Sequence, residues 1–238
     1  MEKEEFINFF NEECEKINIK VNEKQQDMFY NYMIGSLEWN EKVNITAIRE
    51  EKDFIIKHYI DSLTINKLLK DADRVIDIGT GGGFPGVPIK IMNENIEVTL
   101  IDSINKKLNV IRDLTSKIKL KKLDIIHTRA EYLAQDKKYR EMFDVATTRA
   151  VSNFTTIMEY MMPFVKVGGN AICMKGPNYK EELEEAQKAI EILGGKVEYI
   201  ETINIGDEER NIIIVKKVKS TPNKYPRGQG KPLKEPIR

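Results

Sequence analysis

The sequence is poor in the residues that build disulfide frameworks and metal sites. Its 238 residues include only two cysteines and two histidines. Cys14 and Cys173 are too few and too far apart for a disulfide framework or a cysteine-based metal site, and His58 and His127 cannot form a histidine-rich one. We therefore expect no bound metal and no dependence on an oxidising compartment.

Long apolar runs are missing as well. No window approaches the roughly 18 uncharged apolar residues that a membrane-spanning helix needs, although 41% of the residues are hydrophobic. The start, MEKEEFINFF, is acidic and interrupted by charge, unlike a secretory signal. These absences predict a cytoplasmic protein with no membrane partner.

The net charge is zero, but the basic residues are unevenly distributed. Residues 216–238 hold eight basic residues and one acidic residue, which gives this tail a charge of +7. A second cluster between residues 104 and 122 has seven basic residues and only Asp113 as an acid. Such patches fit a polyanionic partner, or equally a solvated helix face followed by a disordered tail.

Periodic apolar patterns divide the chain into a helical beginning and an alternating series. Amphipathic patterns predict helices at about 3–17, 22–38 and 51–70. Apolar runs after Asp73 predict strands at 75–79, 97–102, 123–128, 143–148 and 170–175. Helical patterns lie between and after them, at 86–93, 105–117, 129–135, 152–164 and 179–193. KVEYIETINI and RNIIIVKKV, on either side of a GDEE turn at 206–209, predict a hairpin with one strand antiparallel to the sheet.

The predicted fold class is therefore α/β: a doubly wound, mostly parallel, seven-stranded sheet with an N-terminal helical extension. We expect three parts in the chain. They are a helical section at 1–72, a sheet domain at 73–218 and a basic, proline-rich tail at 219–238. The tail prolines predict an extended strap with exposed cations and no helix.

The segment VIDIGTGGGFPGVPIKI, residues 75–91, predicts a ligand loop. A strand that passes through glycines into a helix brings its backbone close to a ligand, since glycine adopts positive φ and has no Cβ. No Gly-Lys-Ser/Thr follows, which excludes a triphosphate loop of the Walker type. A dinucleotide, S-adenosylmethionine (SAM) and a purely structural loop remain.

Two acids separate these alternatives. Asp77, at the mouth of the loop, would repel a pyrophosphate but would suit the cationic amine of SAM. Asp102 ends the next strand, where an acid accepts hydrogen bonds from ribose hydroxyls, as both SAM and NAD would require. We favour SAM over NAD on the basis of Asp77 and of the terminal hairpin.

Later strand ends supply further candidates, because ligands on such sheets lie at the carboxyl ends of the strands. Glu131 lies near an adenine or is the first-turn acid of a helix. Arg149, in the segment Thr147–Val151, lies beside the reacting centre or forms an ion pair with Asp144 or Glu131. His58 and Asp61 share a helix face, and we favour a local pair that attaches the N-terminal helices to the sheet domain.

Taken together, these motifs resemble the bacterial RsmG (GidB) methyltransferases over nearly the whole chain. The matching segments are WNEKVNITA, HYIDS, VIDIGTGGGFPGVPIKI, IDSINKK, TRAEYL, FDVATTRAV, MKGPNY and YPRGQGKPLKEPIR. The resemblance implies SAM-dependent methylation of N7 of a guanosine in the 530 loop of 16S ribosomal RNA (guanine-527). The implied partner is 16S rRNA or the small ribosomal subunit.

The resemblance also implies site residues. The implied SAM contacts are Gly79, Phe84, Ala130, Glu131 and Arg149, to which we add Gly81, Asp102 and Ser103. We predict that Arg149 orients the reactants without acting as a base. The expected RNA-binding residues are Lys175, Lys224, Arg227, Lys231 and Lys234.

Two other functions remain open. The first is a SAM methyltransferase that acts on another RNA or on a small molecule. The second is a ribosome-assembly factor that keeps a SAM-type fold without turnover. The clustered lysines argue against a small-molecule substrate, and the intact DIGTGGG loop argues against a protein without turnover.

Overall fold

The computed structural model of this chain describes residues 1–149, 152–206 and 208–237. The N-terminal elements are α1 (Lys3–Lys16), α2 (Glu23–Asn40), α3 (Glu51–Phe54), the π-helix η1 (Ile55–Ile60), α4 (Asp61–Leu63) and the short 3-10 helix η2 (Asn66–Leu68). The strands are β1 (Arg74–Ile78), β2 (Glu97–Asp102), β3 (Leu123–His127), β4 (Phe143–Arg149), β5 (Val165–Lys175), β6 (Gly195–Ile205) and β7 (Glu208–Lys217). The remaining helices are α5 (Gly86–Met92), α6 (Asn105–Lys117), α7 (Ala130–Leu133), α8 (Phe154–Met161), α9 (Tyr179–Ile192) and α10 (Lys231–Lys234).

One seven-stranded sheet forms the centre of the molecule, in the order β3-β2-β1-β4-β5-β7-β6. The five strands β3, β2, β1, β4 and β5 are parallel. Strand β7 enters antiparallel to β5, with Cys173 opposite Ile213, and β6 pairs with β7 at the edge. The predicted doubly wound sheet with one antiparallel insertion is confirmed.

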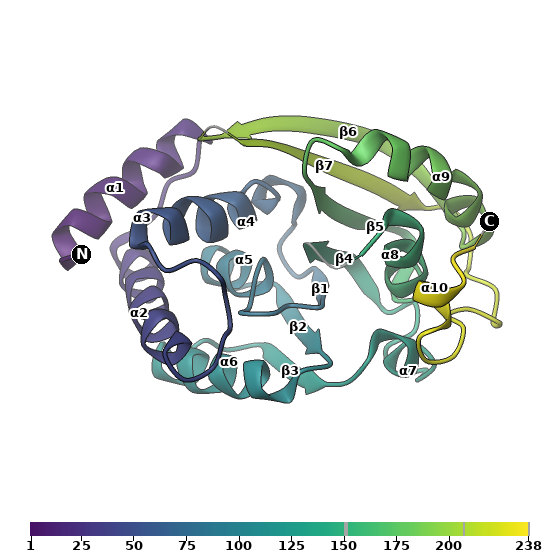
Figure 1. The fold of residues 1–238 in the computed structure, drawn as a ribbon, viewed down its shortest axis with the longest axis horizontal. Coiled ribbons are helices and arrows are strands. Elements are labelled where there is room, and N and C mark those ends of the chain that lie inside the picture. Colours follow the sequence, from purple (N-terminus) through teal and green to yellow (C-terminus); the bar gives the residue numbers. More distant parts are fainter. Residues whose placement is uncertain (150–151, 207, 238) are drawn as a thin grey trace.

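Helices cover both faces of the sheet (Figure 1). Alternate strand residues point to opposite faces, because the side-chain period of a strand is two. Val75 belongs to a hydrophobic cluster that also contains residues of α1, α2, η1, α5 and α6. Its neighbour Ile76 belongs to a second cluster, which contains residues of α7, α8 and α9. The N-terminal helices therefore share one hydrophobic core with the sheet.

The third N-terminal helix differs from the predicted single helix at 51–70. An α-helical turn passes into the π-helix η1 and returns to an α-helical turn at Asp61. A π-turn inserts one residue into the hydrogen-bonded ladder, and such turns are frequent at functional sites. The π-helix has only six residues, so its longer repeat does not show in the apolar pattern of the sequence.

The predicted turn at 206–209 is shorter than expected. Gly206 has a positive φ of 58°, and Glu208 and Glu209 already belong to strand β7. Asp207 lies outside the described residues, as do Ala150 and Val151 of the strand-four motif and Arg238 of the basic tail.

Within the described ranges, no helix has the length and apolar character to cross a membrane. In the same residues, no three histidine, cysteine or acidic side chains come together as metal ligands.

Candidate functional site

The glycine loop joins β1 to α5 at the carboxyl edge of the sheet. Asp77, in strand β1, holds this loop by two hydrogen bonds. Its Oδ2 accepts from the backbone N–H of Gly86 at 2.9 Å and from Thr80 Oγ1 at 2.7 Å. A Cβ on Gly86 would lie 2.8 Å from that same carboxylate and 2.2 Å from Leu100 Cδ2. Glycine at position 86 is therefore required by packing.

The expectation that Asp77 lies at the open mouth of the loop is wrong, because the structure buries its side chain. Its side chain is 0% exposed, and burial raises its pKa to about 6. Its Oδ2 holds the loop from inside the protein, whereas its Oδ1 accepts no hydrogen bond from the described residues. A contact between Asp77 and a ligand amine therefore stays a prediction.

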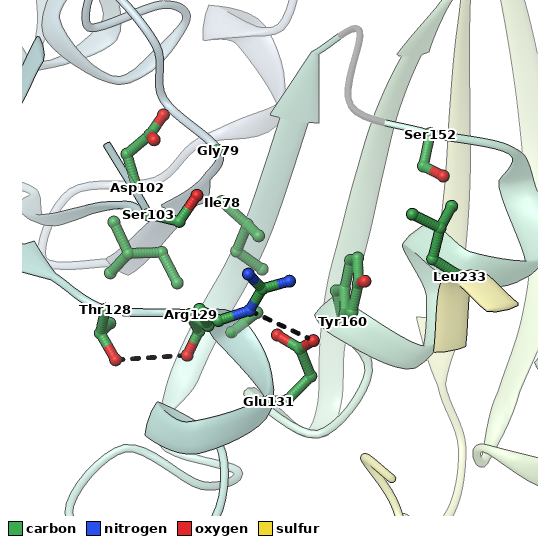
Figure 2. A pocket seen from close by; sticks show the side chains of 12 residues that line it. Ile78, Gly79, Asp102, Ser103, Thr128, Arg129, Glu131, Ser152, Tyr160 and Leu233 are labelled. Atoms are coloured by element: carbon green, nitrogen blue, oxygen red, sulfur yellow. Dashed lines mark hydrogen bonds and ion pairs between the residues drawn. The ribbon is translucent and has the colours of Figure 1, made fainter. Parts of the chain in front are cut away.

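A cavity lies where β1, β2 and β3 end (Figure 2). It is lined by Ile78, Gly79, Ile101, Asp102, Ser103, Thr128, Arg129, Ala130, Glu131, Ser152, Tyr160 and Leu233, and we call it the cofactor cavity. Five of the predicted cofactor residues, Gly79, Asp102, Ser103, Ala130 and Glu131, line it together. The rule that ligands lie at strand carboxyl ends also points to Ile78, Ile101 and Thr128, which the sequence analysis missed.

Asp102 is held rigidly at the edge of the cofactor cavity. Its Oδ2 accepts the backbone N–H of Gly81 at 2.9 Å, and its Oδ1 accepts that of Ile104 at 2.8 Å. Gly81 has a φ of 59°, in the region that favours glycine. Each carboxylate oxygen keeps a second lone pair, so Asp102 can still accept ribose hydroxyls without moving.

Glu131 lies on the opposite wall of the cofactor cavity and is only 4% exposed. Its Oε1 accepts the backbone N–H of Gly230 at 3.1 Å and lies 3.7 Å from Arg129 Nε. Arg129 Nε is buried and makes no hydrogen bond in the described part of the chain. Arg129 was not among the predicted residues, although it immediately precedes the Ala130-Glu131 pair.

Residues 221–237 pack across α7 and α8, and we call them the C-terminal strap (Figure 1). Leu233 of the strap lines the cofactor cavity, and Thr156 Oγ1 donates to the carbonyl of Pro232 at 3.0 Å. The prediction that the prolines exclude a helix is wrong, because α10 contains Pro232. The proline lies in the first turn of that helix, where its missing N–H leaves no hydrogen bond unmade.

The basic residues of the tail differ in exposure and in their partners. Lys224, Lys231 and Lys234 are exposed, as RNA contacts would require. Arg227 instead binds Glu159, which is 1% exposed, through its backbone N–H and its guanidinium. Lys217 is buried, with its Nζ 3.1 Å from Glu141, so part of the tail charge is used inside the protein.

Arg149, at the end of β4, lies in a buried polar cluster with residues of the third helix. Its Nη1 donates to Asp61 Oδ2 at 3.0 Å and to the carbonyl of Lys57 at 2.7 Å, and its Nη2 donates to His58 Nδ1 at 2.8 Å. The alternatives of an ion pair with Asp144 or Glu131 are therefore wrong. Asp61 and His58 attach the N-terminal helices to the sheet by binding Arg149 of β4. The predicted local pair between His58 and Asp61 is not what makes this attachment.

His58 has both ring nitrogens engaged. Because Nδ1 accepts from Arg149, Nε2 carries the proton and donates to Thr46 Oγ1 at 2.7 Å. Burial, and then the charge of Arg149, lowers the pKa of His58 to about 3. The ring also stacks on Phe84, with centroids 4.2 Å apart. Phe84 thus links the glycine loop to the Arg149 cluster.

A second cavity lies beside the first, and we call it the acceptor cavity. It has a volume of about 560 Å³, and its lining includes His58, Asp61, Arg149, Lys175 and Arg210. Lys175 donates to the carbonyl of Ser152, a residue of the cofactor cavity, at 3.2 Å, and forms an ion pair with Glu182 at 2.7 Å. Arg149 and Ser152, close in sequence, therefore line two neighbouring cavities.

The cofactor cavity fits SAM. Gly79, with a φ of 70°, provides a wall without a side chain. Asp102 and Ser103 offer oxygen atoms for ribose hydroxyls, and Glu131 offers an acceptor for an adenine amine. The guanidinium of Arg129 can pair with a carboxylate.

Comparisons with known proteins agree with this geometry. A family model described as GidB, rRNA small subunit methyltransferase G, matches residues 25–213. The chain is 46% identical to a "Ribosomal RNA small subunit methyltransferase G" of Alkaliphilus oremlandii (strain OhILAs), over 98% of this chain and 100% of that protein. A protein of the same name from Clostridium novyi (strain NT) is 44% identical over 98% and 97% of the two chains.

Solved structures support the fold. A SAM dependent methyltransferase from Aquifex aeolicus aligns with a TM-score of 0.54 and 17% identity, over 72% of this chain and 96% of that one. M. jannaschii TYW2, solved in complex with AdoMet, aligns with a TM-score of 0.54 and 14% identity, over 66% and 75%. The family match over most of the chain, and the near full-length relatives, show that this protein belongs to the GidB family and is a SAM-dependent methyltransferase.

Proposed function

We propose that this enzyme methylates N7 of a guanosine in the 530 loop of 16S rRNA, guanine-527, in the cytoplasm. The names of its relatives support a small-subunit rRNA substrate. The state of His58 supports the choice of N7, an atom whose methylation needs no base. Both ring nitrogens of His58 are engaged and its pKa is lowered to about 3, so it is a weak base with no free lone pair.

Guanine N7 carries a free lone pair and no proton. Bound SAM would supply a sulfonium methyl group: the N7 lone pair would form the new N–C bond, the C–S electron pair would stay with sulfur in S-adenosylhomocysteine, and the base would become cationic. The task of the protein is therefore to align two reactants and exclude water, not to remove a proton. Asp102 and Glu131 lie on two walls of the cofactor cavity, and the rigid Arg149 cluster forms part of the neighbouring one.

Methylation at N7 predicts a chemically labile product. A cationic 7-methylguanosine should break the strand after mild reduction and aniline treatment. We expect scission at a single guanosine in small-subunit RNA from cells that contain the enzyme, and none in RNA from cells that lack it. Methyl label recovered on adenine or cytosine instead would refute the proposed reaction.

Asp102 is expected to contribute directly to SAM affinity. In the variant Asp102→Ala, the dissociation constant of SAM should rise about 5- to 150-fold, because hydrogen bonds to a charged acceptor are lost, worth about 1–3 kcal/mol. The N–H groups of Gly81 and Ile104 would also lose their acceptor. Isothermal titration calorimetry measures the change.

Asp102→Asn is the matched control, since it keeps one oxygen in place. We expect an intermediate affinity for this variant. An unchanged affinity in the alanine variant, with the protein folded, would mean that Asp102 only supports the loop.

A further inference from the structure

The acceptor cavity contains a carboxylate that its neighbours do not fully satisfy. Asp61 lines this cavity and is 3% exposed. Its Oδ2 accepts from Arg149, but its Oδ1 accepts no hydrogen bond from the residues that the structure describes. Arg210 Nε lies 3.4 Å from Oδ1 and forms an ion pair with it, without a hydrogen bond. A buried oxygen without a donor is costly, so a donor from a ligand would stabilise it.

The position of the acceptor cavity suits the base that receives the methyl group. It adjoins the cofactor cavity through Arg149, Lys175 and Ser152, and about 560 Å³ is enough space for a nucleobase. A structured RNA presents such a base when it is unstacked from a loop. The π-helix η1 directly precedes Asp61 in this wall.

Guanine has the donor that Asp61 Oδ1 lacks. Its 2-amino group and N1–H lie side by side on the Watson–Crick edge, on the side of the ring away from N7. Adenine has an acceptor at N1 and no 2-amino group. A carboxylate at this position therefore favours guanine, while leaving N7 free to face the cofactor cavity.

We propose that the acceptor cavity binds the target guanine and that Asp61 Oδ1 accepts a hydrogen bond from its 2-amino group. This proposal rests on the proposed N7 methylation. The ring becomes cationic as the methyl group arrives, which makes the 2-amino group a stronger donor. The bond to Asp61 should thus strengthen in the transition state, so Asp61 is expected to act mainly on the rate of transfer.

The test replaces the target guanosine with inosine, which lacks only the 2-amino group. Small subunits are reconstituted with 16S rRNA that carries guanosine or inosine at the target position, and single-turnover transfer of a tritiated methyl group is followed. The wild type should methylate inosine about 10- to 100-fold more slowly. In the variant Asp61→Asn, the guanosine-to-inosine ratio should fall to about threefold or less.

Asp53→Asn is the matched control. Asp53 lies on the same helical run and pairs with Lys57 at 2.9 Å, so the variant removes a nearby negative charge without touching Asp61. We expect it to keep the wild-type ratio.

Three outcomes separate the possible failures. A wild-type enzyme that treats guanosine and inosine alike would overturn the proposal, and this result does not depend on how well any variant folds. A wild-type ratio in Asp61→Asn, with lower rates on both RNAs, would mean that Asp61 only positions Arg149. Failure of the wild type to form 7-methylguanosine on unmodified native subunits would instead refute the proposed function.

Discussion

Replacing Arg149 with alanine is expected to lower methyl transfer about a hundredfold or more and to destabilise the fold by about 3 kcal/mol. The pair of Arg149 and Asp61 is buried, with side chains 14% and 4% exposed. Removing the guanidinium leaves the carboxylate without its hydrogen-bonding partner, which is strongly destabilising in a protein interior. The expected loss of stability lies at the low end of the usual range for a broken buried ion pair, because Arg210 remains close to Asp61. Urea unfolding and single-turnover kinetics measure the two effects.

Two further variants separate charge from geometry at this position. Arg149→Lys keeps the charge but cannot donate to His58, Asp61 and the carbonyl of Lys57 together, so activity should stay low. The double variant Arg149→Ala with Asp61→Ala should regain part of the lost stability, since the Asp61 carboxylate is no longer left buried without Arg149. It should regain no activity. Full activity in Arg149→Ala would show that the cluster is only structural.

The second large effect is expected at Arg227. The variant Arg227→Ala should destabilise the protein by about 3 kcal/mol, because Glu159, 1% exposed, would lose its cation. The C-terminal strap should then detach from α8, and the hydrogen bond from Gly230 to Glu131 should break. SAM affinity should fall with it, since Leu233 lines the cofactor cavity. Urea unfolding, limited proteolysis of the strap and calorimetry with SAM test each step.

The exposed lysines of the strap provide the comparison. Neutralising Lys224, Lys231 and Lys234 to glutamine should leave stability and SAM affinity near wild type. RNA binding should weaken, and its log–log salt dependence should fall by roughly one unit for each RNA phosphate that no longer meets a lysine. If Arg227→Ala is as stable as the wild type and lowers the salt slope instead, Arg227 contacts RNA as the sequence suggested.

The sheet could be predicted from the sequence because its signals are local. Strands β1 and β2 are short apolar runs bounded by turn residues, and the glycine loop follows directly from its own composition. The strand-end rule then brought Asp102 and Glu131 to one cavity although they are far apart in the chain. Each of these inferences needs only the fold class and the register of a strand end.

The parts that could not be predicted depend on contacts between distant residues. Arg227 and Glu159 are 68 residues apart, and nothing in either segment identifies the other as its partner. The burial of Asp77 could not be predicted, because its distance in sequence from the glycines does not show which way the side chain points. It turns into the loop toward Gly86. Arg149 was correctly singled out, but its partners lie on a helix about 90 residues earlier.

The place of Leu233 in the cofactor cavity has a consequence for how the enzyme is made. Protein synthesis delivers the N-terminal part of a chain first, and that part begins to fold while the rest is still being added. All seven strands, which end at Lys217, emerge before Gly230 and Leu233. A growing chain can therefore build its sheet and still have an open cofactor site. We therefore expect chains that stop before Leu233 to bind the methyl donor more weakly than chains that include it.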